Sequence, residues 1–191
     1  MRVDPELAMS TAVSAGIRFF QYRNKGGSKK TIYETARLLA QSARRAGVLF
    51  LVNDHADIAA AVDADGVHLG QDDLPIEAAR KILGSHGIIG ISTHSTEQAI
   101  AAEAAGADYI GFGPIFATTT KDAGRTQGID ALTSITKAVA IPVIAIGGIN
   151  HDNVQVVMKA GAAGAAVISA ILSAPDMKQA AEQMIKNIRN A

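Results

Sequence analysis

The first candidates for chemistry are acidic residues that follow apolar runs of the sequence. Asn53 and Asp54 end one such run, and Asp73 comes shortly after a second run, residues 66–69. If the two runs are neighbouring parallel strands, both aspartates follow the C-terminal strand ends and can face one cation. Mg²⁺ suits two carboxylates because it keeps part of its water shell and leaves room for phosphate oxygens. The spacing leaves a second interpretation open, in which Asp73 caps the next helix.

A cationic segment ends the first apolar run of the chain. Gln21, Arg23 and Lys25 alternate there with Tyr22 and Asn24. Alternate residues of an extended chain face the same side, so an amide and two cations converge. Arginine offers a planar fork and lysine a point charge, a combination that suits a diphosphate. A solvated strand end without a ligand is the alternative.

A hydroxyl-rich stretch follows the apolar run at residues 109–112. It contains Thr118, Thr119, Thr120 and Lys121. Three hydroxyls and a lysine can bind phosphate oxygens, and a loop at this place could close over a substrate and exclude water. Exposed loops rich in threonine are common, so the pattern also allows that simpler interpretation.

Two further segments follow the last two apolar runs, Gly147 with Gly148 and Ile168 with Ser169. Glycines let the backbone approach a ligand, and the start of the next helix offers free N–H groups to a phosphate. A tight turn that needs a positive φ explains the glycines equally well. In a barrel of alternating strands and helices this place often holds a phosphate, which favours a phosphate site if the fold is a barrel.

The composition excludes several classes of protein. Eighteen basic and 18 acidic residues among 191 produce no overall field that favours nucleic acid or an anionic membrane. No cysteine is present, which excludes disulfides, thiolate metal sites and a cysteine nucleophile. The first residues do not show the basic and then apolar pattern of a secretion signal, and no apolar run approaches the ~20 residues of a membrane-spanning helix. We therefore expect a cytoplasmic globular protein whose five histidines, which lack ligand spacing, are structural.

Helical periodicity and end signals predict helices that alternate with β-rich runs. Asp4 and Gly16 mark the ends of the first helix, and Ser95 opens a capping box. The predicted helices cover residues 4–16, 28–47, 57–62, 75–84, 95–106, 130 onward, 152–160 and 177–188. The predicted strands cover residues 17–22, 48–52, 67–69, 88–91, 109–112, 142–146 and 165–169.

This alternation predicts an α/β fold with a parallel sheet, because the strands are almost continuously apolar. A TIM (β/α)₈-type barrel and an open doubly wound sheet both fit the pattern. Polar residues end the strands, as the active face of a barrel requires, and this favours a single barrel domain over residues 1–191. The count is one strand short, because the chain opens on a helix where a barrel opens on a strand.

Seven motifs, taken in order, resemble the thiamine phosphate synthase family. They are QYRNK, VNDHADIA, ADGVHLGQDDLP, IIGISTH, GADYIGFGPIFATTTK, IPVIAIGGI and AAVISAI, and the similarity extends from Gly16 to Ile171. The resemblance implies a Mg²⁺-dependent barrel enzyme that joins 4-amino-2-methyl-5-hydroxymethylpyrimidine diphosphate to a thiazole phosphate and releases diphosphate. It also implies a dissociative reaction, in which diphosphate leaves before the thiazole nitrogen attacks.

The resemblance assigns expected roles to the matching residues. The pyrimidine diphosphate is expected to bind Gln21, Tyr22, Arg23, Asn24, Lys25, Asn53, Ser92 and Lys121. Ser92 and Lys121 are also expected to stabilise the transition state and the leaving group. The thiazole phosphate is expected to bind Thr118, Thr119, Thr120, Gly148, Ile168 and Ser169. Asp54 and Asp73 are expected to bind Mg²⁺.

Two departures from the family pattern leave alternatives open. The family opens on a strand that this chain lacks, so we expect either a start upstream of Met1, which we prefer, or another segment or subunit in the gap. Asn24 stands where the family often has an acid. A thiazole tautomerase-like barrel and a non-catalytic, truncated thiazole phosphate binder are the rival functions, and a homo-oligomer is compatible with the sequence.

Overall fold

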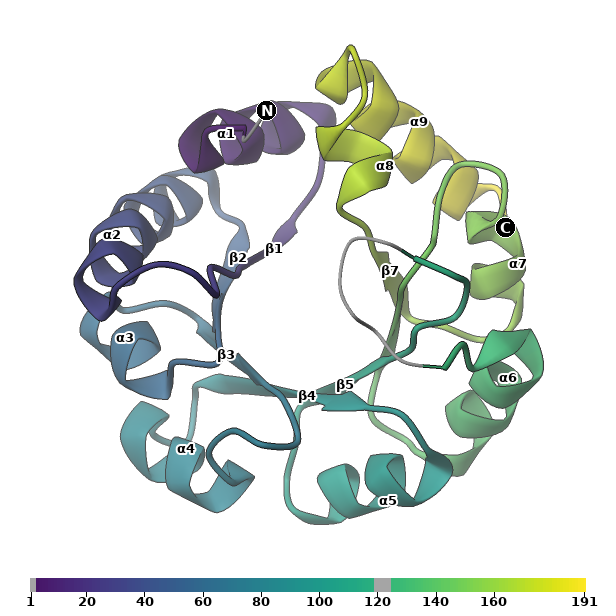
Figure 1. Cartoon of the computed structure of the whole chain (residues 1–191), viewed down its shortest axis with the longest axis horizontal. Helices are drawn as coiled ribbons and strands as arrows, with labels where there is room; N and C mark the ends of the chain where they lie inside the picture. Colours follow the sequence, from purple (N-terminus) through teal and green to yellow (C-terminus); the bar gives the residue numbers. More distant parts are fainter. Residues whose placement is uncertain (1–2, 119–124) are drawn as a thin grey trace. The chain divides into compact units, whose positions relative to one another are not determined.

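The computed structural model describes residues 3–118 and 125–191. Strands and helices alternate through these residues, and the strands follow their sequence order in the sheet (Figure 1). The strands are β1 (Phe19–Tyr22), β2 (Leu49–Asn53), β3 (Gly66–Leu69), β4 (Ile88–Thr93), β5 (Tyr109–Phe112), β6 (Val143–Ile146) and β7 (Gly164–Ala166). The predicted α/β fold with seven parallel strands is thereby confirmed.

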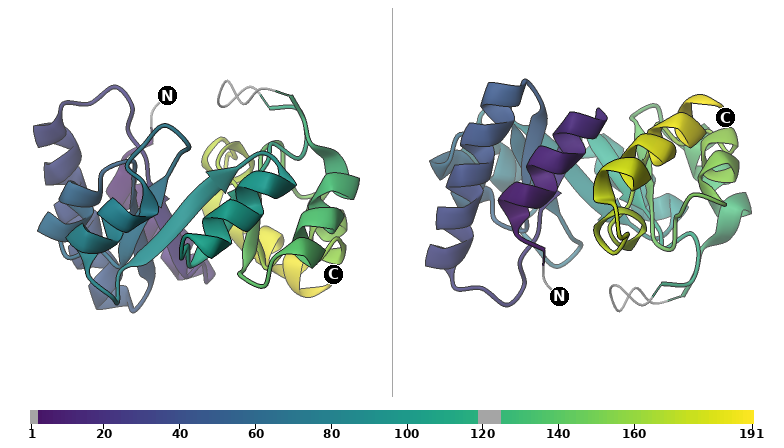
Figure 2. Two further views of the ribbon diagram at one scale, coloured as in Figure 1. Left: turned by 90° about the horizontal axis from the view of Figure 1, so that it is seen from below. Right: turned by 90° about the horizontal axis from the view of Figure 1, so that it is seen from above.

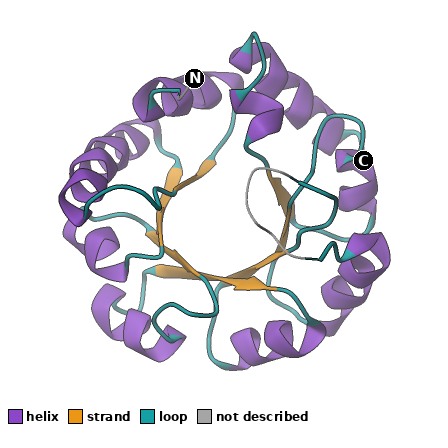
Figure 3. Cartoon of the chain, in the orientation of Figure 1, coloured by secondary structure: helices purple, strands orange, loops and turns teal. Residues whose placement is uncertain are grey.

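Nine helices accompany the strands in the described residues (Figure 3). They are α1 (Pro5–Ala15), α2 (Lys29–Ala46), α3 (Ala56–Ala61), α4 (Ile76–Leu83), α5 (Thr96–Ala104), α6 (Gly128–Ala138), α7 (Val154–Lys159), α8 (Ser169–Leu172) and α9 (Met177–Arg189). Contacts along the chain group these elements into two compact units, Met1–Ile89 and Gly90–Ala191. None of the helices in the described ranges is long and apolar enough to cross a membrane.

The first unit is built on parallel pairing of β1 with β2 and of β2 with β3. Val52 lies beside Val67 in this register, and Asn53 lies beside His68. The side chains of β2 and β3 are buried, as in Phe50, except for Leu49 at the start of β2. Helix α2 packs on β2, and α3 packs on both β2 and β3. This packing explains why these strands are nearly continuous apolar runs.

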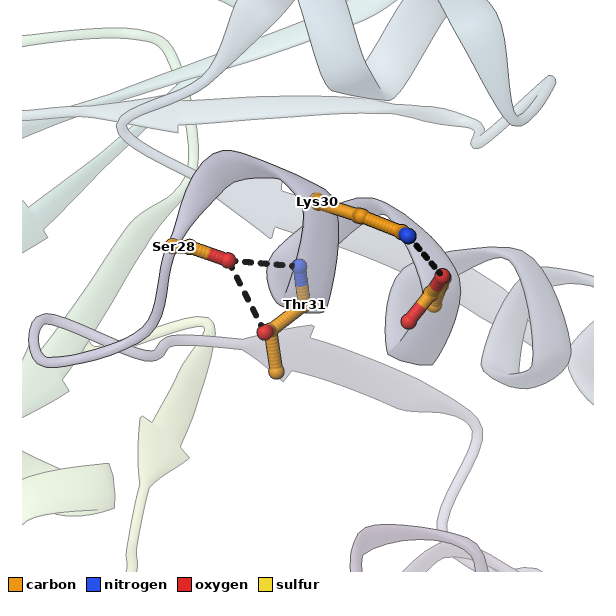
Figure 4. A network of polar contacts seen from close by, with 4 residues as sticks. Ser28, Lys30 and Thr31 are labelled. Atoms are coloured by element: carbon orange, nitrogen blue, oxygen red, sulfur yellow. Dashed lines mark hydrogen bonds and ion pairs between the residues drawn. The ribbon is translucent and has the colours of Figure 1, made fainter.

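Local caps fix both ends of the first two helices. Asp4 Oδ1 accepts a hydrogen bond from Leu7 N at 2.9 Å, and Gly16 closes α1 in a left-handed conformation. Ser28 Oγ accepts from Thr31 N at 3.1 Å and also contacts the Thr31 hydroxyl (Figure 4). Side-chain acceptors of this kind satisfy N–H groups that a helix start leaves free. The predicted ends of α1 and α2 are confirmed.

The second unit joins β4 to β5, β5 to β6 and β6 to β7 in parallel pairs. Helix α9 packs against α7 and α8, which can be followed in Figure 2. Ala181 and Met184 are the buried residues of α9, the helix that the sequence predicted over residues 177–188.

Some predicted boundaries are wrong. The strand predicted over residues 165–169 is β7, Gly164–Ala166, and Ser169 begins the short helix α8. The chain leaves the extended conformation at Ile168, whose φ and ψ are −125° and −76°. Helix α6 begins at Gly128, two residues before its predicted start, and Pro75 occupies the N-cap of α4.

Gly66 offers a test of how closely β3 and β4 approach. A Cβ atom at Gly66 would collide with the backbone of Ile88. Because backbone cannot move aside as a flexible side chain can, Gly66→Ala should lower the free energy of unfolding by about 3 kcal/mol in urea denaturation. Gly26→Ala is the control, because nothing lies within 4 Å of its Cβ position. Equal stability of the two variants would contradict this packing.

Candidate active site

Asp54 and Asp73 meet beyond the ends of β2 and β3. Asp54 directly follows β2, and its N–H donates to His68 O at 2.8 Å, which continues the pairing with β3. Asp73 follows β3 by four residues, and its Oδ2 accepts a hydrogen bond from Gly70 N at 2.6 Å. Helix α4 starts without a side-chain cap, so Asp73 does not cap it. The structure thus favours the paired interpretation of the two carboxylates over the capping one.

The shift in the pKa of Asp54 reflects its burial and its contact with the carboxylate of Asp73. Burial raises the pKa of Asp54, and the charge of Asp73 and a hydrogen bond between the two side chains raise it further. Arg23 and Lys25 act in the opposite direction and lower the pKa of Asp54. The two carboxylates and two cations that the sequence pattern singled out therefore act on one another.

The backbone of Asp54 is itself unusual. Its φ is 66°, in the left-handed region that few residues other than glycine, asparagine and aspartate adopt. Such conformations are found most often at sites where the surrounding structure holds them for function. The sequence contained no signal for this feature, because aspartate occurs in many ordinary turns.

Polar contacts organise the strand ends beside the carboxylates. Gln21 Nε2 donates to Asn53 Oδ1 at 2.6 Å, joining two of the residues that were expected to bind the pyrimidine diphosphate. Asn24 uses its side chain locally: Nδ2 donates to the Tyr22 hydroxyl at 3.3 Å, and Oδ1 accepts from Gly26 N at 3.2 Å. Asn24 thus shapes the turn that carries Lys25 towards α2.

A cavity of about 880 Å³ opens at these strand ends. Lys25, Asp54 and Asp73 line it, and a 2.9 Å ion pair between Lys29 and Asp57 lies on its rim. The hydrogen bond with Lys29 lowers the pKa of Asp57. This volume is large enough for a small phosphorylated ligand.

A smaller cavity of about 450 Å³ lies at the opposite ends of β1 and β2. Its charged residues already serve the fold: Arg44 donates to Asp63 O at 3.1 Å, and Asp65 accepts from Phe50 N at 2.7 Å. We therefore place the candidate active site of this unit at the Asp54 end of the strands.

The two carboxylates fit a hard cation. Asp54 and Asp73 are half-buried and in contact, and burial and the charge of Asp73 raise the pKa of Asp54 despite the nearby Arg23 and Lys25. Within residues 3–118 and 125–191, no group of three or more His, Cys, Asp or Glu side chains could hold a metal. A cation at this pair would take its remaining ligands from water or from a bound substrate, which is the usual arrangement for Mg²⁺.

In the second unit, the turn after β6 contacts the loop after β5. Ile115 N donates to Ile146 O at 2.9 Å, and Phe116 N donates to Gly147 O at 3.0 Å. Gly148 has a φ of 66°, and a Cβ there would collide with the Ala117 carbonyl and with Phe116. The glycine pair thus satisfies the positive φ that a tight turn requires, and it lets two site loops touch.

The other residues of this unit that were predicted to bind substrate lie on separate elements. Ser92 is half-buried in β4, and Thr118 is half-buried in the loop after β5. Ile168 and Ser169 are both exposed at the start of α8. Thr119, Thr120 and Lys121 lie outside the described residues.

Sequence reasoning missed one polar contact of this unit. The ring Nδ1 of His94 lies 2.6 Å from the carbonyl oxygen of Gly113. A histidine one residue beyond a strand end can reach the neighbouring strand, which was an available signal. It received no weight because the histidines were screened for metal-ligand spacing.

The comparisons with known proteins agree on one family. The family model described as thiamine monophosphate synthase matches residues 4–171. A thiamine-phosphate synthase of Chloroflexus aurantiacus is 49% identical over 177 residues, which are 92% of this chain and 82% of the relative. A thiamine-phosphate synthase of Pyrococcus furiosus is 45% identical over 97% of this chain and 89% of its own length.

A solved structure is similar over nearly the whole chain. The thiamine phosphate pyrophosphorylase of Pyrococcus furiosus superimposes with a TM-score of 0.92 at 43% identity, covering 98% of this chain and 90% of that one. The motifs of the sequence, the family match and this structural similarity give the same answer. The chain belongs to the thiamine monophosphate synthase family of enzymes.

Proposed function

We propose that the protein catalyses the thiamine phosphate synthase reaction. It would join 4-amino-2-methyl-5-hydroxymethylpyrimidine diphosphate to a thiazole phosphate and release diphosphate. The observation that carries the proposal is the Asp54–Asp73 pair with Arg23 and Lys25 acting on it. A metal–diphosphate group needs this combination of hard oxygen ligands and nearby cations. The names of the relatives support the same reaction.

Asp54 and Asp73 are the residues that would hold Mg²⁺. When bound there, the ion would neutralise charge on the departing diphosphate. Arg23 and Lys25 would bind the same group from the protein side, and the resemblance adds Lys121 and Ser92. Gln21 and Asn53 would orient the pyrimidine through their linked amides.

The residues of the site include no obvious general base, and the proposed chemistry needs none. The nucleophile is a neutral ring nitrogen that has no proton to lose. The barrier lies in separating the diphosphate from the pyrimidine and in keeping water from the cation that forms. Cationic and hydrogen-bonding residues at the strand ends suit the first task, and a bound substrate together with the loop after β5 would have to provide the second.

The second unit would receive the thiazole phosphate. By resemblance its ligands would be Thr118, Thr119, Thr120, Gly148, Ile168 and Ser169. Gly148 supports this assignment because its turn lies against the loop that leads to Thr118. A backbone free of a Cβ atom can approach phosphate oxygens closely.

The wider properties follow from the same resemblance. We expect a (β/α)₈-type barrel as the single domain of residues 1–191, supported by the strand order and by the Pyrococcus furiosus structure. We also expect a cytoplasmic enzyme with small-molecule substrates and without a nucleic-acid or membrane partner. The paired carboxylates argue against a tautomerase-like role, which has no metal–diphosphate task.

The direct test supplies both substrates with Mg²⁺ and measures thiamine phosphate. Formation of the product with release of one diphosphate per turnover is the expected result. Binding of the thiazole phosphate without any product would instead identify a non-catalytic binder and overturn the proposal.

Replacing either carboxylate by an amide should impair catalysis while leaving the protein folded. Asp54→Asn and Asp73→Asn should each lower kcat by roughly 100-fold or more, because the leaving group loses its charge neutralisation. Asp63→Asn is the matched control, since Asp63 also has a positive φ, of 50°, but lies in a different turn. Unchanged turnover and Mg²⁺ dependence in both site variants would exclude these residues as ligands.

The raised pKa of Asp54 predicts that replacing this residue changes thermal stability in opposite directions without and with Mg²⁺. A folded-state pKa above the unfolded one adds stability at low pH that is lost as pH rises through the folded value. Without metal at pH 7, Asp54→Asn should therefore raise Tm relative to the wild type. Asparagine also tolerates the positive φ at this position.

Adding Mg²⁺ should make the wild type more stable than Asp54→Asn. At a concentration 100-fold above its Kd, a ligand of the folded state stabilises the wild type by about 2.7 kcal/mol. The Asp54→Asn variant should gain much less, and differential scanning fluorimetry with and without Mg²⁺ measures both effects. A wild type that is more stable than the variant in the absence of metal would contradict the proposed repulsion.

A substitution at Gly148 tests the proposed thiazole phosphate site of the second unit. A Cβ at Gly148 would push back Ala117 and Phe116, so Gly148→Ala should raise KM for the thiazole phosphate about tenfold or more. Gly106→Ala is matched, because Gly106 has a φ of 89° but nothing within 4 Å of its Cβ position. The idea fails if the two variants have the same KM.

A further inference from the structure

His94 links the end of β4 to the loop that follows β5. Its ring Nδ1 lies 2.6 Å from Gly113 O, and its backbone N–H donates to Gln98 Oε1 at 2.8 Å. The preceding residue makes a similar contact, because the Thr93 hydroxyl donates to Gly111 O at 3.2 Å. The Thr93 contact lies within the β4–β5 ladder, which ends at Thr93 and Phe112, and the His94 contact extends the pairing by one residue, to Gly113.

The chemistry of this contact fixes the tautomer of the ring. A carbonyl oxygen can only accept a hydrogen bond, so Nδ1 of His94 must carry the proton. In the neutral ring Nε2 then has a lone pair and no hydrogen. The side chain itself is exposed, and the backbone contact with Gln98 holds the residue in place.

Gly113 is the first residue of the segment that reaches the glycine turn. This segment, residues 113–117, is joined to the end of β6 by the N–H groups of Ile115 and Phe116. Gly148 accepts the close approach of its last residues. A shift at Gly113 would therefore be transmitted through a buried segment, residues 113–115, to the turn around Gly148.

We propose that His94 is a positioning residue for the thiazole phosphate, acting through its Nδ1–H on Gly113. The inference rests on the proposed function, because it uses Gly148 and the loop after β5 as the thiazole phosphate site. His94 sets the start of that loop from the β4 side, while the two backbone bonds to Ile146 and Gly147 set it from the β6 side. The ring does not touch the reacting atoms in this role.

Two amide substitutions separate the two ring nitrogens. Asparagine places an N–H donor near the position of Nδ1, whereas glutamine places its amide near the position of Nε2. A positioning role through Nδ1 predicts that His94→Asn behaves like the wild type and that His94→Gln behaves like His94→Ala. A role of Nε2 on the substrate predicts the opposite order.

The experiment measures kcat, both KM values and Tm for these three variants. Loss of one neutral hydrogen bond should raise KM for the thiazole phosphate about three- to tenfold in His94→Ala and His94→Gln. His94→Asn should stay within about twofold of the wild type by the same reasoning. KM for the pyrimidine diphosphate should not change in any of them, and His86→Asn at an exposed site is the control.

Ring nitrogen NMR provides an independent readout. The wild type should show the Nδ1–H tautomer for one histidine whose signals vanish in His94→Asn. Rescue by glutamine but not asparagine, a normal KM in His94→Ala, or an equal rise of both KM values with loss of Tm would each overturn the proposal. If the wild type forms no thiamine phosphate, the proposed function fails, and calorimetric binding of the thiazole phosphate to the same variants still decides the role of His94.

Discussion

Backbone pairing between β2 and β3 holds two carboxylates together against their mutual repulsion, and the chemistry of the first unit depends on this constraint. The Asp54 N–H is bonded to the β3 strand, and the Asp73 carboxylate is bonded to the turn that leaves β3. The Asp73 carboxylate cannot turn away without breaking its bond to Gly70, and the Asp54 bond fixes the backbone position from which the other carboxylate projects. Burial and this repulsion together raise the pKa of Asp54, so a bound cation would relieve part of the strain by offsetting the paired negative charge.

The positive charge that an anionic ligand needs must come from a local cluster, because the chain as a whole has no net charge. Basic and acidic residues are equal in number, so no long-range field steers a diphosphate to the protein. Arg23 and Lys25 instead lie in a turn that Asn24 shapes and that ends in the capped start of α2. Fixing that turn matters because flexible cations would lose much of their interaction energy to ordering on binding.

The sequence predicted most elements because caps and apolar spacing are local signals. The Asp4 cap is read directly from residue type, and parallel pairing follows from buried strands that alternate with helices. The register that brings Asp73 to Asp54 arises from tertiary packing, so spacing could only suggest it. The left-handed φ of Asp54 also arises from that packing and had no signal in the sequence. Helix α8 was missed for a similar reason, since residues 165–169 form an uninterrupted β-like run and the departure at Ile168 has no residue-type signal.

A pair of carboxylates with one raised pKa could also serve as an acid and a base, and the surroundings decide between the two roles. A general acid must keep its proton near neutral pH, which apolar surroundings favour. Burial and the neighbouring Asp73 raise the pKa of Asp54 here, and Arg23 and Lys25 oppose that rise. The same two cations are useful beside a metal-bound diphosphate, where charge accumulates as the bond breaks. These neighbours would suit a metal-bound diphosphate better than a proton-transfer pair, which is why we propose the two carboxylates as ligands.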